Sequence, residues 1–239
     1  MIPWKLLDTA KVPGGGNDEL RLKQRGAEFV IMLGDNQLMS NRLSATEQGL
    51  ATIACDGLRD AKQPRILIGG LGMGFTLRAA LKVLGPKARI EVAELVPAVV
   101  AWGRGPLAEI FDGCLDDARV TIHETDVGEL ICAGKLAYDA ILLDVDNGPE
   151  GLSREANDAL YDEKGLRAAH AALRPGGVLA IWSSAPHPEF AARLRKPKFA
   201  VKEIALRAKG PRGGARHFIW TAMRADQHRP SPNRHRRPI

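Results

Sequence analysis

The chain has 239 residues, of which 45% are hydrophobic and 26% charged, a composition ordinary for a soluble globular domain. No apolar stretch approaches the roughly 20 residues that span a bilayer, and residues 1–11 lack a secretory-signal pattern, so we expect a cytoplasmic protein without membrane contact. The cysteines (Cys55, Cys114 and Cys132) are widely spaced, which argues against a disulfide framework or a zinc site.

The formal net charge of +6 is concentrated at the end of the chain. Residues 224–239 contain five arginines against one aspartate, together with three prolines and few apolar residues. This composition predicts a disordered basic tail, which either keeps the protein soluble or contacts RNA or an acidic partner. Because the remaining body carries little excess charge, we expect nucleic-acid binding only through such basic segments.

The N-terminal segment, residues 1–43, is expected to be a small β-hairpin appendage. It is expected to be irregular to about residue 18, where prolines and glycines break regular structure. Residues 19–40 then contain short runs of alternating apolar and polar residues, separated by turns near Gly26 and Gly34.

From residue 44 the pattern changes to alternating helices and strands. Ser44 is the expected N-cap of a helix to about Leu58, and Glu47, three residues on, completes a capping box. The later strands are expected at residues 65–69, 89–93, 120–123, 138–143, 178–182, 199–206 and 217–223. The later helices are expected at 75–84, 98–110, 157–173, closed by Pro175-Gly176-Gly177, and from about 188.

This order predicts an α/β fold for residues 44–223. Repeated strand-helix units form a Rossmann-like, doubly wound and mostly parallel sheet. The last two strands are joined by the short glycine-rich link of residues 210–214, which predicts a C-terminal antiparallel strand pair.

A glycine-rich loop follows the first strand of this unit. Gly70, Gly72 and Gly74 allow a tight turn and let the backbone approach a ligand. Glu94 ends the next strand, where an acid accepts hydrogen bonds from ribose hydroxyls, and Asp126 follows the third strand, where a carboxylate meets an adenine amino group. The three features together predict an adenosyl site; the alternative is a loop shaped by packing alone.

Two acids follow the fourth strand of the unit. Asp144 and Asp146 stand at the carboxyl end of a buried strand, the edge where open α/β sheets bind ligands. Such a pair attracts an ammonium group, and one carboxylate accepts a proton as the amine attacks. The alternative is that residues 146–149 form a polar turn that Asp144 caps.

These motifs resemble those of the polyamine aminopropyltransferase (spermidine synthase) family, a branch of the class I methyltransferase fold. The family's loop Gly-Gly-Gly-Asp-Gly-Gly-Thr-Leu-Arg is similar to residues 70–78, and its strand Tyr-Asp-x-Ile-x-x-Asp to residues 138–144. The resemblance covers roughly residues 19–223. It implies transfer of an aminopropyl group from decarboxylated S-adenosylmethionine to a small amine, without a metal, and is compatible with a homodimer.

The resemblance also implies roles for the matching residues. Asp144 is then the catalytic base. The donor is held by the loop glycines and by two acids with the residues that follow them, namely Gly70, Gly72, Gly74, Glu94, Leu95, Asp126 and Val127. The amine acceptor is lined by Gln37, Glu47, Asp146 and Tyr161.

Departures from the family's pattern concern the substrate. Met73 stands where the family has the Asp that holds the donor's amine, which removes a charge-assisted bond of about 1.5–3 kcal/mol. The second Asp of the acidic segment, Asp146, is displaced by one residue. Ala45 and Gly165-Leu166 replace expected tyrosines, which leaves Tyr161.

Two alternatives therefore stay open. One is an S-adenosylmethionine-dependent methyltransferase of unknown substrate, which Met73 favours. The other is a non-catalytic protein that binds an adenosyl ligand, or binds RNA through residues 207–216 and the tail. The histidines, among them His217, show no metal-ligand spacing and are expected to be structural or exposed; Trp102 and Trp182 are expected in the core or a pocket wall.

Overall fold

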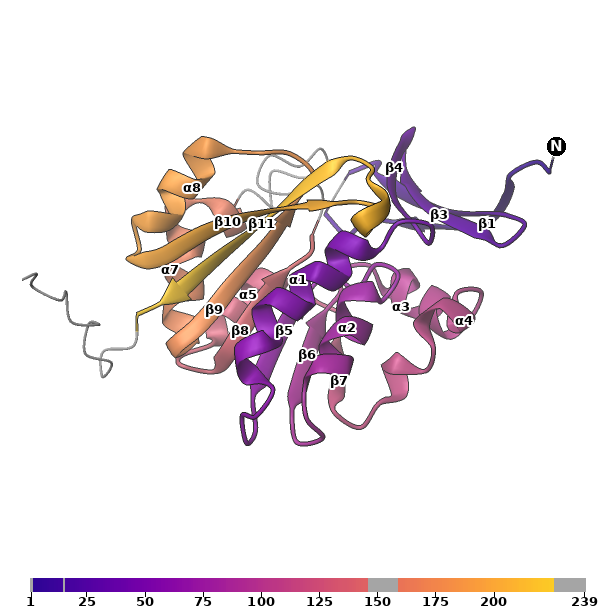
Figure 1. The fold of residues 1–239 in the computed structure, drawn as a ribbon. Coiled ribbons are helices and arrows are strands. Elements are labelled where there is room, and N and C mark those ends of the chain that lie inside the picture. Colours follow the sequence, from indigo (N-terminus) through magenta and orange to yellow (C-terminus); the bar gives the residue numbers. More distant parts are fainter. Residues whose placement is uncertain (1, 15, 146–158, 226–239) are drawn as a thin grey trace, which may run out of the picture.

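The structure, a computed structural model, describes residues 2–14, 16–145 and 159–225. It contains a large sheet between two layers of helices and a smaller sheet beside it (Figure 1). The small sheet is antiparallel, in the order β1-β2-β3-β4, with strands β1 (Lys5–Lys11), β2 (Glu19–Arg25), β3 (Glu28–Leu33) and β4 (Asn36–Ser40).

The large sheet has the strand order β10-β11-β9-β8-β5-β6-β7. Strands β5 to β9 are parallel, whereas β11 runs antiparallel between β9 and β10. The bounds are β5 (Arg65–Gly69), β6 (Arg89–Ala93), β7 (Val120–His123), β8 (Tyr138–Leu143), β9 (Leu173–Ser183), β10 (Phe199–Arg207) and β11 (Arg216–Arg224). The expected fold class, with its antiparallel pair at one edge, is confirmed.

Helices cover both faces of this sheet (Figure 1). They are α1 (Ala45–Cys55), α2 (Phe75–Val83), α3 (Pro97–Arg104), α4 (Ala108–Phe111), α5 (Val127–Ala133), α7 (Glu163–Ala172) and α8 (Pro188–Arg195), with short 3-10 turns at 56–58, 114–116 and 210–212. Alternate strand residues feed two cores, because side chains point to opposite faces. Ile66 and Leu142 pack in the core with α1 and α2, whereas Leu67 and Leu143 pack with α5 and α7.

The N-terminal region forms more structure than expected. Residues 5–11, expected to be irregular, form β1, which pairs with β2 from Lys5 opposite Gln24 to Lys11 opposite Glu19. The pairing is irregular between Leu6 and Asp8, and the strand is largely exposed, so its sequence lacks the clean alternation that marks a strand. The appendage is therefore a four-stranded sheet rather than a hairpin.

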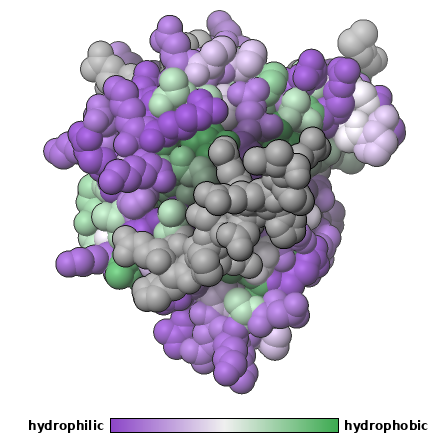
Figure 2. All heavy atoms as spheres, turned by 60° about the vertical axis from the view of Figure 1, so that its left-hand side comes forward, coloured by the Kyte–Doolittle hydropathy of each residue, from purple (hydrophilic) through white to green (hydrophobic). Residues whose placement is uncertain are grey.

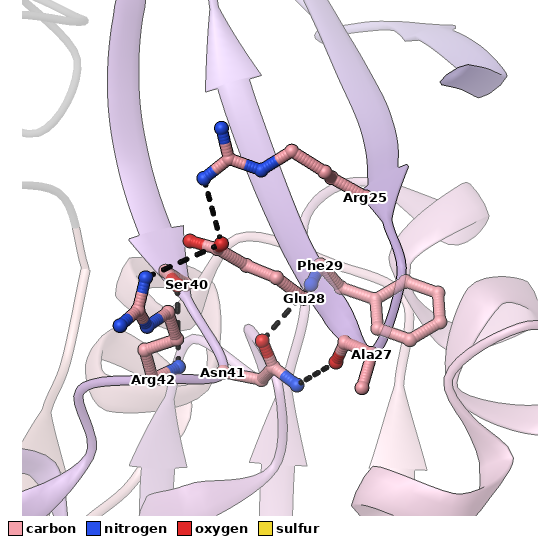
Figure 3. A network of polar contacts seen from close by, with 7 residues as sticks. All are labelled: Arg25, Ala27, Glu28, Phe29, Ser40, Asn41 and Arg42. Carbon is pink, nitrogen blue, oxygen red and sulfur yellow. Dashed lines mark hydrogen bonds and ion pairs between the residues drawn. The ribbon is translucent and has the colours of Figure 1, made fainter. Parts of the chain in front are cut away.

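The end of this sheet is closed by a polar network (Figure 3). Asn41 accepts the backbone N–H of Phe29 and donates to the carbonyl of Ala27, both at 2.9 Å. Glu28 pairs with Arg25 at 2.9 Å and with Arg42 at 3.4 Å. The network fixes the path of the chain from the small sheet into α1.

The expected capping box at α1 is wrong. The Ser44 side chain makes no cap bond; its hydroxyl oxygen accepts from the Gln48 amide at 2.8 Å. Glu47 does not turn back to the helix N-terminus but accepts the Thr46 hydroxyl at 2.9 Å in a partly buried position. Glu47, expected to complete a helix cap, therefore bonds the neighbouring Thr46 side chain instead.

Other element ends also differ from expectation. The helix expected at 98–110 is two helices, because the first helix ends before Gly105 and Pro106 and a second begins at Ala108. Pro175-Gly176-Gly177 does not close a helix but lies within β9, where pairing with β8 is irregular. Arg224, assigned to the tail, is the last residue of β11 and donates to the carbonyls of His170 and Leu173. The tail from residue 226 lies outside the described residues.

Candidate active site

The acids predicted to hold a donor and to react lie along one cavity. Glu94 follows β6, Asp126 follows β7 and Asp144 follows β8, so all three come from carboxyl ends of parallel strands in one sheet, where β5 separates β8 from β6. All three line a hollow with about 890 Å³ of empty space, part of it open to solvent. The sequence predicts this convergence from the position of each acid at the end of a strand.

The small sheet supplies the opposite wall of the cavity. Its contribution is largely apolar and includes Leu20, Ile31, Leu33, Leu38 and Met39. Trp102 of α3 secures this sheet, because its indole N–H donates to the Asp8 carboxylate at 2.7 Å. Figure 2 shows hydrophilic residues at the periphery of one face and apolar residues gathered towards its middle. A fourth acid, Asp18, also lines the cavity and was missed in the sequence.

The glycine loop serves two purposes. Gly70 has φ +87°, and a Cβ there would lie 2.4 Å from the carbonyl oxygen of Asp144, so the loop lies directly against the end of β8. Gly70 and Gly72 line the cavity. Gly74 instead precedes α2, where a Cβ would lie 2.8 Å from the Phe111 ring. Packing therefore explains Gly74, whereas Gly70 and Gly72 leave backbone open to a ligand.

Glu94 is held by the loop that it supports. Its Oε2 accepts the N–H of Leu71 and its Oε1 accepts the N–H of Val96, both at 2.9 Å. Burial raises the pKa of the Glu94 carboxyl, and these amide hydrogen bonds oppose the rise. The side chain is 8% exposed. Backbone N–H groups of Gly72 and Leu95 lower the pKa of Glu94 as well, so the carboxylate stands oriented at the cavity wall.

Asp126 begins α5 and retains acceptor capacity. Its Oδ1 accepts the N–H of Gly128 at 2.7 Å, which caps the helix. No hydrogen bond to its Oδ2 occurs within the described part of the chain. Leu95 and Val127 line the cavity beside the two acids, as expected for residues that follow them.

Asp144, at the end of β8, has a strongly perturbed carboxyl. Its Oδ2 accepts the hydroxyl of Thr76, in the first turn of α2, at 2.6 Å. Burial and then the charge of Glu47 raise the pKa of Asp144 to about 7, against the Thr76 bond, which lowers it. An acid with such a pKa exchanges a proton readily near neutral pH.

Glu47 lies beside Asp144 although it comes from α1. Thr76 Oγ1 stands 3.2 Å from the carbonyl oxygen of Glu47, so one hydroxyl touches both residues. Burial raises the pKa of the Glu47 carboxyl, whereas hydrogen bonds from the backbone and Thr46 lower it. Two partly buried carboxyls whose charges repel each other do not both ionise readily, so they compete for one proton.

The other predicted acceptor residues are placed apart. Gln37 is exposed on β4, and only its neighbours Leu38 and Met39 reach the cavity. Tyr161 is 1% exposed, in the core with α8, where its ring packs edge-on against Phe190 at 5.7 Å. Asp146 lies outside the described residues.

Met73, the main departure from the family's pattern, does not face the cavity. It is 1% exposed and packs in the core around α1 and α2. The functional neighbours missed in the sequence are Thr46 and Thr76. The position of Thr76 could have indicated this role, since the first turn after the glycine loop lies close to the carboxyl end of the neighbouring strand in the sheet, here β8.

Two general features bear on the class of protein. The described residues hold no group of three or more His, Cys, Asp or Glu side chains placed to bind a metal ion. Within the same ranges, every helix is too short or too polar to cross a bilayer.

Comparison with known proteins finds similar sequences and similar folds. No family model matches the chain. Polyamine aminopropyltransferase 2 of Pseudomonas aeruginosa is 31% identical over 156 residues, which are 61% of this chain and 41% of that protein. The chain spans between 31% and 41% of the curated polyamine aminopropyltransferases that it matches.

Solved structures agree in fold. A spermidine synthase in complex with the transition-state analogue AdoDATO superposes with a TM-score of 0.71 over 93% of this chain and 73% of that one, at 18% identity. A didemethyltoxoflavin methyltransferase of Burkholderia thailandensis, solved with S-adenosylhomocysteine, gives a TM-score of 0.52 over 77% of this chain and 80% of that one, at 25% identity. The chain is therefore similar in sequence to polyamine aminopropyltransferases over part of their length, and its fold is shared with spermidine synthases and a methyltransferase.

Proposed function

We propose that the protein is a transferase that moves an alkyl group from an adenosyl sulfonium donor to an amine. The observation that carries the proposal is the single cavity shared by Glu94, Asp126 and Asp144. Glu94 would accept from the ribose hydroxyls and Asp126 Oδ2 from the adenine amino group, over the backbone of Gly70 and Gly72. The known adenosyl-type ligands of the two solved relatives support this assignment.

The paired carboxyls favour an amine as the acceptor. Asp144 and Glu47 together carry negative charge beside the cavity, which attracts an ammonium group. The amine must lose a proton to react, and Asp144, with a pKa of about 7, accepts it. The amine nitrogen then forms a bond to the donor carbon as the carbon-sulfur bond breaks, and the sulfur leaves as a neutral thioether.

The group transferred is proposed to be aminopropyl, supplied by decarboxylated S-adenosylmethionine. The support is the family itself, since the curated relatives are named polyamine aminopropyltransferases. The acceptor is then a small amine, whose cationic form suits the Asp144–Glu47 pair.

Methyl transfer is the second candidate. Met73 is apolar and buried where an acid for the aminopropyl amine is expected, so the donor end has no matching charge there. A methyltransferase is also among the solved structures that share the fold, at 25% identity. S-adenosylmethionine is the donor in this case.

Calorimetric titration with the two donors separates these candidates. Tighter binding of decarboxylated S-adenosylmethionine supports aminopropyl transfer, and tighter binding of the carboxylated donor overturns it in favour of methyl transfer. Absence of binding by both contradicts the whole proposal. Asp144→Asn should then abolish transfer from the preferred donor while its affinity changes little, because Asp144 contacts the reacting amine and not the adenosyl group.

A further inference from the structure

A chain of hydrogen bonds leads from Glu47, beside Asp144, to His217 on β11. His217, on β11, has its Nδ1 at 2.9 Å from the Thr46 hydroxyl oxygen. The same hydroxyl donates to Oε2 of Glu47 at 2.9 Å. Thr46 is 1% exposed, so no bulk water competes for these contacts. These hydrogen bonds therefore link the imidazole of His217 to the carboxyl of Glu47.

The direction of the chain fixes the form of the imidazole. A hydroxyl has one hydrogen, and Thr46 gives that hydrogen to Glu47. Its oxygen must then accept from His217, which requires the proton to sit on Nδ1. The Trp182 ring, edge-on at 4.9 Å from the imidazole, holds this orientation. Burial lowers the pKa of His217, so the neutral ring is the form present near pH 7.

We infer that His217 is a positioning residue, which through Thr46 keeps the Glu47 carboxylate ionised so that Asp144 receives the amine's proton. The titratable groups that interact with Glu47 in the described ranges are Asp144, directly, and His217, through Thr46. Thr76 donates to the Asp144 side chain but only reaches the backbone oxygen of Glu47. Removal of Thr46 takes away the side-chain donor to Glu47, and removal of His217 takes away the group that orients this donor. In both cases the Glu47 carboxyl competes more strongly for the shared proton.

This inference rests on the proposed role of Asp144, but its test needs neither substrate nor turnover. In protein labelled with 15N-histidine, the nitrogen shifts of His217 should report the Nδ1–H tautomer of the neutral ring, identified by its absence in His217→Phe. A neutral Nε2–H tautomer overturns the inference, because the chain would then run in the opposite direction.

The second measurement locates the shared proton. Samples labelled with 13C-carboxyl aspartate or glutamate are titrated, with Asp144→Asn and Glu47→Gln for assignment. In the parent protein the step around pH 7 should appear mainly on Asp144. In His217→Phe and Thr46→Val the larger part of the step should move to Glu47, whereas His217→Gln, which keeps an N–H donor, should restore it to Asp144.

The matched control is His187→Phe, which alters another imidazole, tilted at 6.2 Å from the Trp220 ring. The step should stay on Asp144 in this variant. A step that stays on Asp144 in both His217→Phe and Thr46→Val overturns the inference, even if donor binding and transfer are intact. Failure of donor binding, by contrast, contradicts the proposed function alone.

Discussion

Thr76 donates its hydroxyl hydrogen to Oδ2 of Asp144 across 2.6 Å and so joins the first turn of α2 to the end of β8. Thr76→Val keeps the shape of this buried side chain and removes the bond. Because the bond favours the ionised carboxyl, the pKa of Asp144 should rise further above its ordinary value. Transfer at pH 7 should fall by about threefold to tenfold and recover at higher pH.

The measurement for Thr76→Val is the pH dependence of kcat/KM. Its matched control is Thr121→Val, on β7, where the side chain is exposed. If the fall of kcat/KM at low pH is the same in Thr76→Val as in the parent protein, that fall does not come from protonation of Asp144.

Asp144→Asn should stabilise the fold at high pH. The folded-state pKa of about 7 lies above the ordinary value of 3.8, so the folded protein binds a proton that the unfolded chain has released. The free energy of unfolding therefore decreases as pH rises from 3.8 to about 7, and the buried charge remains costly above that range. The amide avoids this cost, and we expect a gain of about 1–3 kcal/mol at pH 8 that vanishes near pH 4.

Urea unfolding of Asp144→Asn at several pH values tests this expectation. Asp56→Asn, on a surface 3-10 turn, serves as the control and should show no such pH-dependent gain. A loss of stability at pH 8 in Asp144→Asn would show that the ionised carboxyl is favoured in the fold.

Gly70→Ala should disrupt the site as well as the loop. A Cβ at this position meets the carbonyl oxygen of Asp144 at 2.4 Å, so β8 and the loop must separate. Gly113→Ala has a comparable φ of +72° but no atom within 4 Å of its Cβ, and it isolates the cost of the backbone conformation. We expect about 1 kcal/mol of destabilisation for Gly113→Ala and about 2–4 kcal/mol for Gly70→Ala, measured by urea unfolding. Equal losses of stability in the two variants would contradict the close contact between Gly70 and the Asp144 carbonyl.

Met73→Asp should not create an aminopropyl site. Met73 is 1% exposed in the core, so an Asp in its place would bury an unpaired carboxyl. We expect a loss of several kcal/mol in stability and no gain in affinity for decarboxylated S-adenosylmethionine. Met73→Leu, which keeps the apolar volume, should cost less than about 1.5 kcal/mol. Tighter donor binding by a folded Met73→Asp would show that this position faces the ligand.

The large sheet could be predicted from sequence because its central strands are short apolar runs buried on both faces. The bounds expected for 65–69, 89–93, 120–123 and 138–143 agree with β5 to β8. Since ligands bind at the carboxyl ends of such strands, Glu94, Asp126 and Asp144 could be placed at one edge as well.

Contacts made by packing could not be predicted in this way. Glu47 stands three residues after Ser44, a spacing typical of a capping box, and only the packing of α1 brings it to Asp144. His217 reaches Thr46 because β11 inserts between β9 and β10, an order that local periodicity does not contain. Similarly, β1 depends on its partner β2 rather than on its own alternation.

The division of the cavity between two sheets has a consequence for the evolution of the protein's specificity. Strands β2 to β4 contribute apolar surface to the cavity, whereas the strand ends of the large sheet contribute its acids. On the proposed function, mutations at Leu33 or Leu38 would alter the accepted molecule, while the environments of Asp144 and Glu47 would stay set by α1, α2 and β11. New specificities would then be reachable without a change in the acids.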